Sequence, residues 1–155
     1  MDKQQRPYHI RFAVQEDMAQ IMELCAAHAA YEQSAYDAEG KEDHLADALF
    51  GKKPLLHCLV AEKEGVLMGY ATYMYQYSTW DACQYVYMDC LYLHDRYRSQ
   101  GIGKALMLRI KEEAGTAGCH LIQWQTPDFN EGAIRFYKRM GAYAKSKERF
   151  FWEWT

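Results

Sequence analysis

Residues 97–107 read YRSQGIGKALM, a glycine turn that runs directly into an apolar helical pattern. Gly101 and Gly103 stand two positions apart, and Arg98 stands three positions before the first of them. Glycine tolerates the backbone angles of a tight turn and lets a ligand approach the main chain. The free N–H groups and the dipole of a helix N-terminus favour a bound anion. Because Arg98 and Lys104 add positive charge, we expect a phosphate or pyrophosphate here, in preference to a turn without a ligand.

The spacing of this loop excludes two other phosphate-binding turns. It is not GxxxxGK[ST], so it is not the loop of a Walker-type nucleotide-binding protein. It is also not GxGxxG after the first strand of a parallel unit, so a dinucleotide-binding fold is not expected.

The rest of the chain predicts an α/β domain around a mixed, mainly antiparallel sheet. A hairpin is expected around Gly65, and Gly141 is expected to follow the last helix as its C′ residue. Helices are predicted at 15–33, 41–50, 102–118 and 130–140. Strands are predicted at 8–14, 55–64, 66–77, 83–93, 119–126 and 148–154.

Length and charge narrow the class of protein. The chain has 155 residues, half of them hydrophobic and a quarter charged, which suits a single globular domain over 1–155. A net charge of −3 argues against a nucleic-acid partner. No apolar run is long enough for a membrane span or a signal peptide, so no membrane partner is expected.

Cysteine and histidine usage indicates a cytoplasmic protein without a metal. The five cysteines are odd in number and form no CxxC pair, which disfavours a disulfide framework or a zinc site and suits a reducing compartment. The six histidines show neither HxxxH nor HExxH spacing, so no metal ligand set is predicted.

The glycine loop resembles the acyl-CoA signature of the GNAT superfamily of N-acetyltransferases, Arg98-x-x-Gly101-x-Gly103 after a strand. AAYEQ at 29–33, HCLVAE at 57–62 and FNEGAIRFYKRMGA at 129–142 are similar to the spermidine/spermine (diamine) acetyltransferases and their thialysine-acetylating relatives. The resemblance extends from about residue 8 to the C-terminus. It implies the GNAT fold, with about seven strands and about four flanking helices.

The resemblance also implies acetyl-CoA as the co-substrate. Its pyrophosphate is expected on the glycine loop, and backbone N–H groups of the preceding strand are expected to hold the acetyl carbonyl. The cofactor-binding residues so predicted are Leu91, Tyr92, Leu93, Arg98, Ser99, Gln100, Gly101, Ile102, Gly103, Lys104, Asn130 and Tyr137.

Asn130 and Tyr137 are seven positions apart, close to two helical turns, and are therefore expected on the same side of one helix. Asn130 is predicted to cap that helix, which is compatible with a contact to the cofactor. From the pattern alone Tyr137 is a core aromatic. The resemblance assigns it instead as the general acid that protonates the departing CoA thiolate.

Asp89 is the predicted general base. The diamine acetyltransferases usually have a glutamate followed by an aspartate here, whereas this chain has Asp89-Cys90. A water bridging the gap left by the shorter acid would preserve the role. A strand-edge carboxylate bonded to backbone is an equally weighted alternative. Cys90 would be an acyl-carrying nucleophile only with an activating base, and no histidine is visibly placed for that, so direct attack by the amine is favoured.

Tyr31-Glu32 match a pair that borders the polyamine site in the resembling proteins, and Asp89 is expected to face the same substrate. Glu39, Glu42 and Asp43 follow closely and make an acidic rim plausible, which suits a polycation. The alternative for Glu32 is a solvated helix end.

The sequence therefore predicts an acetyl-CoA-dependent N-acetyltransferase for a small diamine or polyamine. The alternatives are acetylation of a lysine-like amino acid or a protein lysine, and a non-catalytic CoA- or polyamine-binding sensor. The resemblance, together with Phe150, Phe151, Trp152 and Trp154 on both faces of the predicted last strand, favours a homodimer.

Overall fold

In the computed structural model, which describes residues 7–155, five strands form one sheet in the order β1-β2-β3-β4-β5. The first three neighbouring pairs are antiparallel, and β4 and β5 are parallel. The prediction of a mixed, mainly antiparallel sheet is thus confirmed. The strands are β1 His9–Phe12, β2 His57–Lys63, β3 Val66–Ser78, β4 Cys83–Leu93 and β5 Ile122–Gln123.

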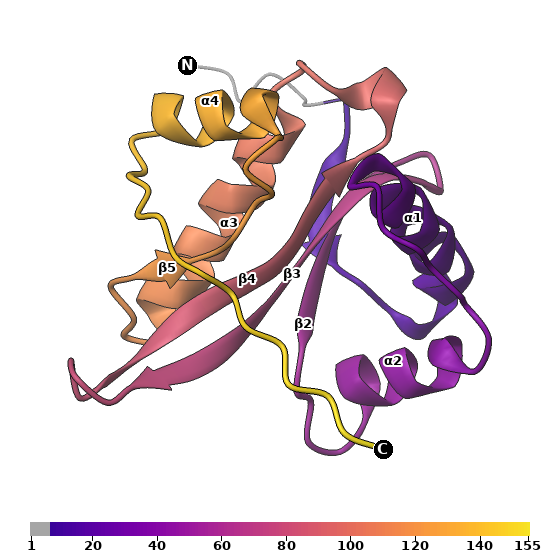
Figure 1. Cartoon of the computed structure of the whole chain (residues 1–155). Coiled ribbons are helices and arrows are strands. Elements are labelled where there is room, and N and C mark those ends of the chain that lie inside the picture. Colours follow the sequence, from indigo (N-terminus) through magenta and orange to yellow (C-terminus); the bar gives the residue numbers. More distant parts are fainter. Residues whose placement is uncertain (1–6) are drawn as a thin grey trace. The chain divides into compact units, whose positions relative to one another are not determined.

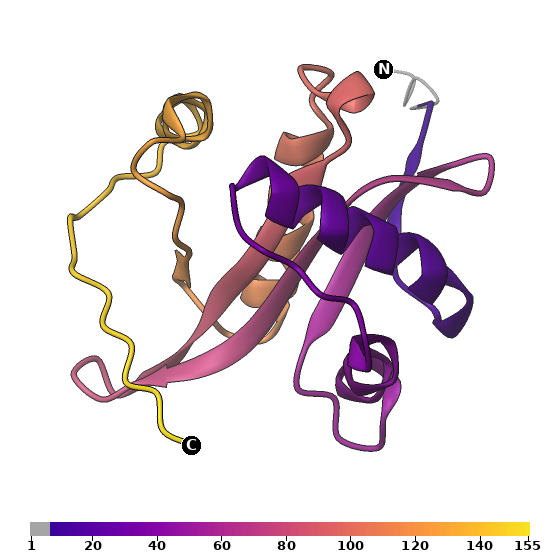
Figure 2. The same cartoon turned by 45° about the vertical axis from the view of Figure 1, so that its right-hand side comes forward.

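Helices cover both faces of this sheet (Figures 1 and 2). α1 (Met18–Tyr31) and α2 (Lys41–Phe50) lie on one face, and α3 (Ile102–Thr116) lies on the other. The core beneath α1 contains the buried side chains Ile21, Leu24, Val60, Tyr70 and Tyr92. On the other face, α3 buries an apolar stripe formed by Ile102, Leu106, Ile110 and Ala114.

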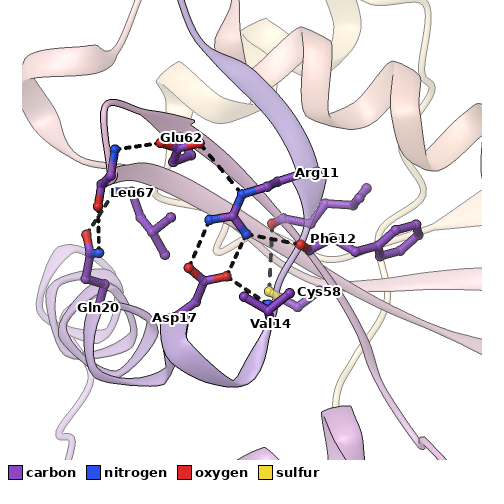
Figure 3. A network of polar contacts seen from close by, with 10 residues as sticks. Arg11, Phe12, Val14, Asp17, Gln20, Cys58, Glu62 and Leu67 are labelled. Atoms are coloured by element: carbon purple, nitrogen blue, oxygen red, sulfur yellow. Dashed lines mark hydrogen bonds and ion pairs between the residues drawn. The ribbon is translucent and has the colours of Figure 1, made fainter.

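The start of α1 is fixed to the sheet by a polar network (Figure 3). Arg11 on β1 donates from Nη1 to Asp17 Oδ2 at 2.7 Å and from Nη2 to Asp17 Oδ1 at 3.0 Å. The backbone N–H of Val14 donates to the same carboxylate at 2.8 Å. These bonds, led by the one from Arg11, lower the pKa of Asp17 against the opposing effect of its burial. One turn later, Gln20 donates to the Gly65 carbonyl oxygen at 3.0 Å.

β5 is much shorter than the strand predicted over 119–126. Side chains alternate between exposed and half-buried from Leu121 to Gln125, as in an extended segment. Only Ile122 and Gln123 pair with β4, opposite Val86 and Tyr87. An extended segment is a β-strand only where a neighbouring strand forms backbone hydrogen bonds with it.

Residues 126–155 form a separate compact unit. Its helix α4 (Glu131–Arg139) begins at Asn130, whose side-chain oxygen accepts a hydrogen bond from the Ala133 N–H at 3.2 Å, and the predicted N-cap is confirmed. Gly141 follows the helix with φ +97°, as expected for a C′ glycine.

The predicted strand over 148–154 is wrong, and residues 142–155 contain no helix or strand. The sheet therefore has five described strands, not about seven. The aromatic composition favours extended structure, but a strand needs a partner for its backbone groups. Phe150, Phe151, Trp152 and Trp154 are 73–90% exposed.

Candidate functional site

A β-bulge in β4 places Asp89 outside the regular ladder. Thr72 on β3 pairs with Cys90 and Tyr73 pairs with Met88, so the register skips Asp89. A bulge leaves its extra residue unpaired and redirects the side chain. The Asp89 side chain is exposed, and its Oδ2 accepts a hydrogen bond from the Cys90 thiol at 3.6 Å. That Asp89 acts as the base stays a prediction.

One edge of β4 is paired with β5 only at Val86 and Tyr87. Leu91, Tyr92 and Leu93 lie further along, and their other edge pairs with β3 through Ala71, Tyr70 and Gly69. Alternate N–H groups of a strand point to opposite edges, so this stretch directs backbone donors away from β3. The geometry is compatible with the predicted contact to an acetyl carbonyl.

The glycine loop has the features of an anion site. Gly101 is the N-cap of α3 with φ +80°, and it supplies no side-chain cap. The first turn of this 15-residue helix therefore keeps N–H groups that its own cap does not satisfy. A Cβ at Gly101 would meet nothing within 4 Å, so the space beside the turn is not filled by protein. Ser99 and the exposed Lys104 flank the turn, which fits a pyrophosphate.

Arg98 connects this loop to the C-terminal end of α1. Its Nε donates to the Leu93 carbonyl oxygen at 3.1 Å, and its Nη1 pairs with Asp95 at 3.0 Å. The guanidinium lies 4.2 Å from the centroid of the Tyr31 ring and 5.4 Å from that of Tyr92. The structure therefore brings a predicted cofactor-binding residue against a predicted substrate-binding residue.

Glu32 ends α1 and carries a partly exposed carboxylate. Its Oε1 lies 3.1 Å from Nε2 of His28, one turn earlier, and Nδ1 of His28 lies 2.8 Å from Tyr70 Oη. The exposed fraction of the side chain falls from 34% at Glu32 to 12% at His28, so the chain of contacts leads inward. The imidazole stacks on Tyr92 with ring centroids 5.1 Å apart.

Sequence reasoning missed His28 and Tyr70 as parts of this site. It assigned no role to either residue. The i,i+4 spacing of His28 and Glu32 is the signal that was available, because such residues face each other on a helix.

Tyr70 and Cys90 are held in their neutral forms. Burial, followed by the nearby Asp89, raises the pKa of the Cys90 thiol to about 12. Burial also raises the pKa of the Tyr70 phenol well above its usual range. Near pH 7 Cys90 is therefore a thiol, which is not the nucleophilic form.

Asn130 and Tyr137 lie in the second unit, residues 126–155. Asn130 caps α4, and Tyr137 is half-buried on that helix with its ring 5.4 Å from the Phe136 ring. Their assignment to the cofactor rests on the resemblance and on their spacing of seven positions. Glu39, Glu42 and Asp43, the predicted acidic rim, are exposed before and within the first turn of α2.

Comparison with known proteins gives the family. The sequence pattern described as "Acetyltransferase (GNAT) family" matches residues 16–142. The thialysine N-epsilon-acetyltransferase of Mus musculus is 33% identical over 141 residues, covering 86% of this chain and 82% of the mouse protein. The chain belongs to the GNAT acetyltransferase family and is an acetyltransferase.

Two further comparisons extend this result. The spermidine/spermine N(1)-acetyltransferase-like protein 1 of Homo sapiens is 28% identical over 91% of this chain and 21% of its own length. A crystal structure described as a transcriptional regulator from Bacillus halodurans C-125 superposes with a TM-score of 0.81 at 24% identity, covering 94% of this chain and 99% of that one. At this identity the structural likeness shows the fold, which is the predicted α/β GNAT fold. No helix within residues 7–155 is both long and apolar enough to cross a membrane.

Proposed function

We propose that this acetyltransferase transfers an acetyl group from acetyl-CoA to a primary amine of a small diamine or polyamine. The observation that carries the proposal is the packing of Tyr31 on Arg98, because it brings the carboxylate-bearing end of α1 to the glycine loop. A site that joins an anion-binding loop to an acidic helix end suits one anionic and one cationic substrate.

Acetyl-CoA, which the family implies, is held in this proposal by the residues named from the sequence. The N-terminus of α3, with Ser99, Gly101 and Lys104, receives the pyrophosphate. Backbone N–H groups of residues 91–93 polarise the acetyl carbonyl, where negative charge develops during attack.

In the proposed reaction the amine first loses a proton. A lysine-like amine has a pKa near 10.4 and is mostly an ammonium at pH 7. Asp89, on the bulge, accepts this proton through a water. The neutral nitrogen attacks the carbonyl carbon and a C–N bond forms. The C–S bond then breaks and the thiolate takes a proton from Tyr137, while the second proton of the attacking nitrogen leaves through water and restores the Tyr137 phenol.

Direct attack is preferred to an acetyl-cysteine intermediate. Cys90 is the cysteine beside the proposed base, and its pKa of about 12 leaves it a thiol at neutral pH. A thiol with so little thiolate is a poor acceptor for the acetyl group.

Acetylation of a lysine-like amino acid is the second candidate, and the 33% identity to a thialysine acetyltransferase favours it. Such a substrate carries an α-carboxylate that needs a cation. Arg98 lies beside Tyr31 and is the cation that this candidate would use.

A panel of amines with acetyl-CoA, read by release of free thiol, tests the proposal. A short diamine should show kcat/KM roughly tenfold above a monoamine of equal carbon count. The reason is the charged hydrogen bond between its second ammonium and Glu32, whose favourable free energy is partly offset by the loss of solvation. Glu32→Gln should remove most of that preference. Equal reaction of the two amines would contradict the proposal, and preference for a lysine-like amino acid would favour the second candidate.

We also propose that the enzyme acts in the cytoplasm as a homodimer. All five cysteines are unpaired, as suits a reducing compartment. The exposed aromatic side chains of residues 150–154 supply the surface for a second subunit.

A further inference from the structure

On its buried side, Glu32 begins a series of polar side-chain contacts that the proposed reaction does not use. Glu32 Oε1 contacts His28 Nε2 at 3.1 Å, and His28 Nδ1 contacts Tyr70 Oη at 2.8 Å. The imidazole is also held between two rings, stacked on Tyr92 at 5.1 Å and edge-on to Tyr70 at 5.9 Å. His28 is therefore fixed from the sheet side, through contacts with both β3 and β4.

The positions of the protons in this series follow from chemistry. An ionised carboxylate has only acceptors, so Nε2 of His28 must carry the proton that lies between it and Glu32. The Tyr70 phenol keeps its proton because burial raises its pKa, so it can donate to Nδ1. After burial, the neighbouring Cys90 and Cys25 thiols raise the pKa of this phenol further. With a neutral imidazole, Tyr70 donates to Nδ1 of His28 and Nε2 of His28 donates to Glu32.

We propose that His28 is a positioning residue for the amine substrate: anchored by Tyr70 and stacked on Tyr92, it holds one oxygen of Glu32 so that the other faces the distal ammonium of a diamine. This inference rests on the proposed function. A glutamate at a helix end has several rotamers, and fixing it before the substrate arrives reduces the ordering cost of binding. His28 thus acts on affinity for the second nitrogen and not on the bond-forming step.

The test is a double-mutant cycle between His28→Phe and Glu32→Gln, with putrescine and butylamine as substrates of equal carbon count. Phenylalanine keeps a ring against Tyr92 and removes both nitrogens. We expect His28→Phe to raise KM for putrescine roughly tenfold and for butylamine less than about threefold, with kcat for putrescine lowered far less than KM is raised. In the Glu32→Gln background, His28→Phe should not raise KM for putrescine further, because the carboxylate that His28 positions is no longer present.

A matched control is His57→Phe. His57 on β2 stacks on Tyr73 with the same centroid separation of 5.1 Å, and its ring also packs edge-on against Tyr75. A comparable loss of putrescine affinity in His57→Phe would overturn the inference, since it would show a general effect of losing a stacked imidazole. Additive effects of His28→Phe and Glu32→Gln would overturn it too.

Two measurements keep the test decisive if His28→Phe does not fold. Tyr70→Phe removes only the hydroxyl and should raise KM for putrescine in the same direction. ¹⁵N NMR of the wild-type protein labelled at histidine should place a proton on Nε2 of His28, and a bare Nε2 would overturn the inference. If wild-type enzyme shows no diamine preference, the proposed function and this inference fail together. If the preference exists and depends on Glu32 but not on His28, the inference alone fails.

Discussion

Gly101 and Asn130 are both N-cap residues, but only Asn130 accepts a hydrogen bond with its side chain. Asn130 caps α4 with its own side chain, whereas Gly101 offers α3 no side-chain cap. The first N–H groups of α3 therefore have no side-chain acceptor at the N-cap, and we predict that a phosphate accepts from them. Gly101 also has φ +80°, so any side chain there would strain the turn whether or not a ligand binds.

Lys104 gives a cleaner test of the anion site than Gly101. It is exposed in the first turn of α3, so Lys104→Gln should leave the fold intact. We expect the Kd for acetyl-CoA to rise about threefold to tenfold, roughly 0.7–1.4 kcal/mol, and the effect to shrink at high salt. Calorimetric titration measures it. Lys111→Gln, on an exposed position of the same helix, is the control and should bind normally.

Tyr137→Phe tests the general acid. The substitution keeps the ring and removes the acidic proton, so kcat should fall by around 10² while acetyl-CoA affinity changes little. Tyr143→Phe, at a position 79% exposed in the same unit, is the matched control. Normal turnover in Tyr137→Phe would show that another group protonates the thiolate.

At the scale of elements, β1 and α1 are joined by the Arg11–Asp17 pair. The carboxylate is almost fully buried and receives both the guanidinium and the Val14 N–H. α1 then runs from this anchor to Tyr31 at the site. The bonds that lower the pKa of Asp17 exist only in the folded state, which links the stability of this junction to pH.

Asp17→Asn should lower the free energy of unfolding by about 1.5–3 kcal/mol at pH 7, because a charged hydrogen-bond pair is lost. The folded-state pKa of Asp17 is depressed, so its contribution is full above the unfolded value of about 3.9 and is lost as pH falls through the folded value. The difference between variant and wild type should therefore shrink in acid. Urea unfolding at several pH values measures this. Glu16→Gln, an exposed neighbour, should have little effect at any pH.

The elements also show where pattern reasoning reaches its limit. The α2 boundaries at Lys41 and Phe50 and the hairpin around Gly65 agree with their predictions, because local signals determine them. The bulge at Asp89 has no local signal in CQYVYMDCLYL. It arises from the register of β4 on β3, a property of two strands together.

At the scale of the whole molecule, the exposed aromatic tail carries the prediction of a homodimer. Phe150, Phe151, Trp152 and Trp154 present more apolar surface than isolated exposed residues usually do. Light scattering at micromolar concentration should report a dimer. Replacing Phe151 and Trp152 together by Asp should yield a monomer, and a wild-type monomer at that concentration would contradict the prediction. That residues 1–155 act as one N-acetyltransferase domain also stays a prediction.

The sequence by itself determined the fold class, the order of helices and strands up to α4, the glycine loop and the membership of an acetyltransferase family. These depend on periodicity, on the cap residues Asn130 and Gly141, and on a contiguous motif, all of which are local. The sequence also singled out Asp89 and Glu32, although it left their roles open.

Only the tertiary structure decided which distant residues meet. The cation of Arg98 lies on Tyr31, and the imidazole of His28 joins Glu32 to Tyr70, through contacts that span 67 and 42 positions of sequence. It likewise decided that β5 pairs over only two residues and that the aromatic tail forms no strand. The physical reason is the same in each case: side-chain composition sets a preference, but a strand or a polar contact exists only when another part of the chain supplies its partner.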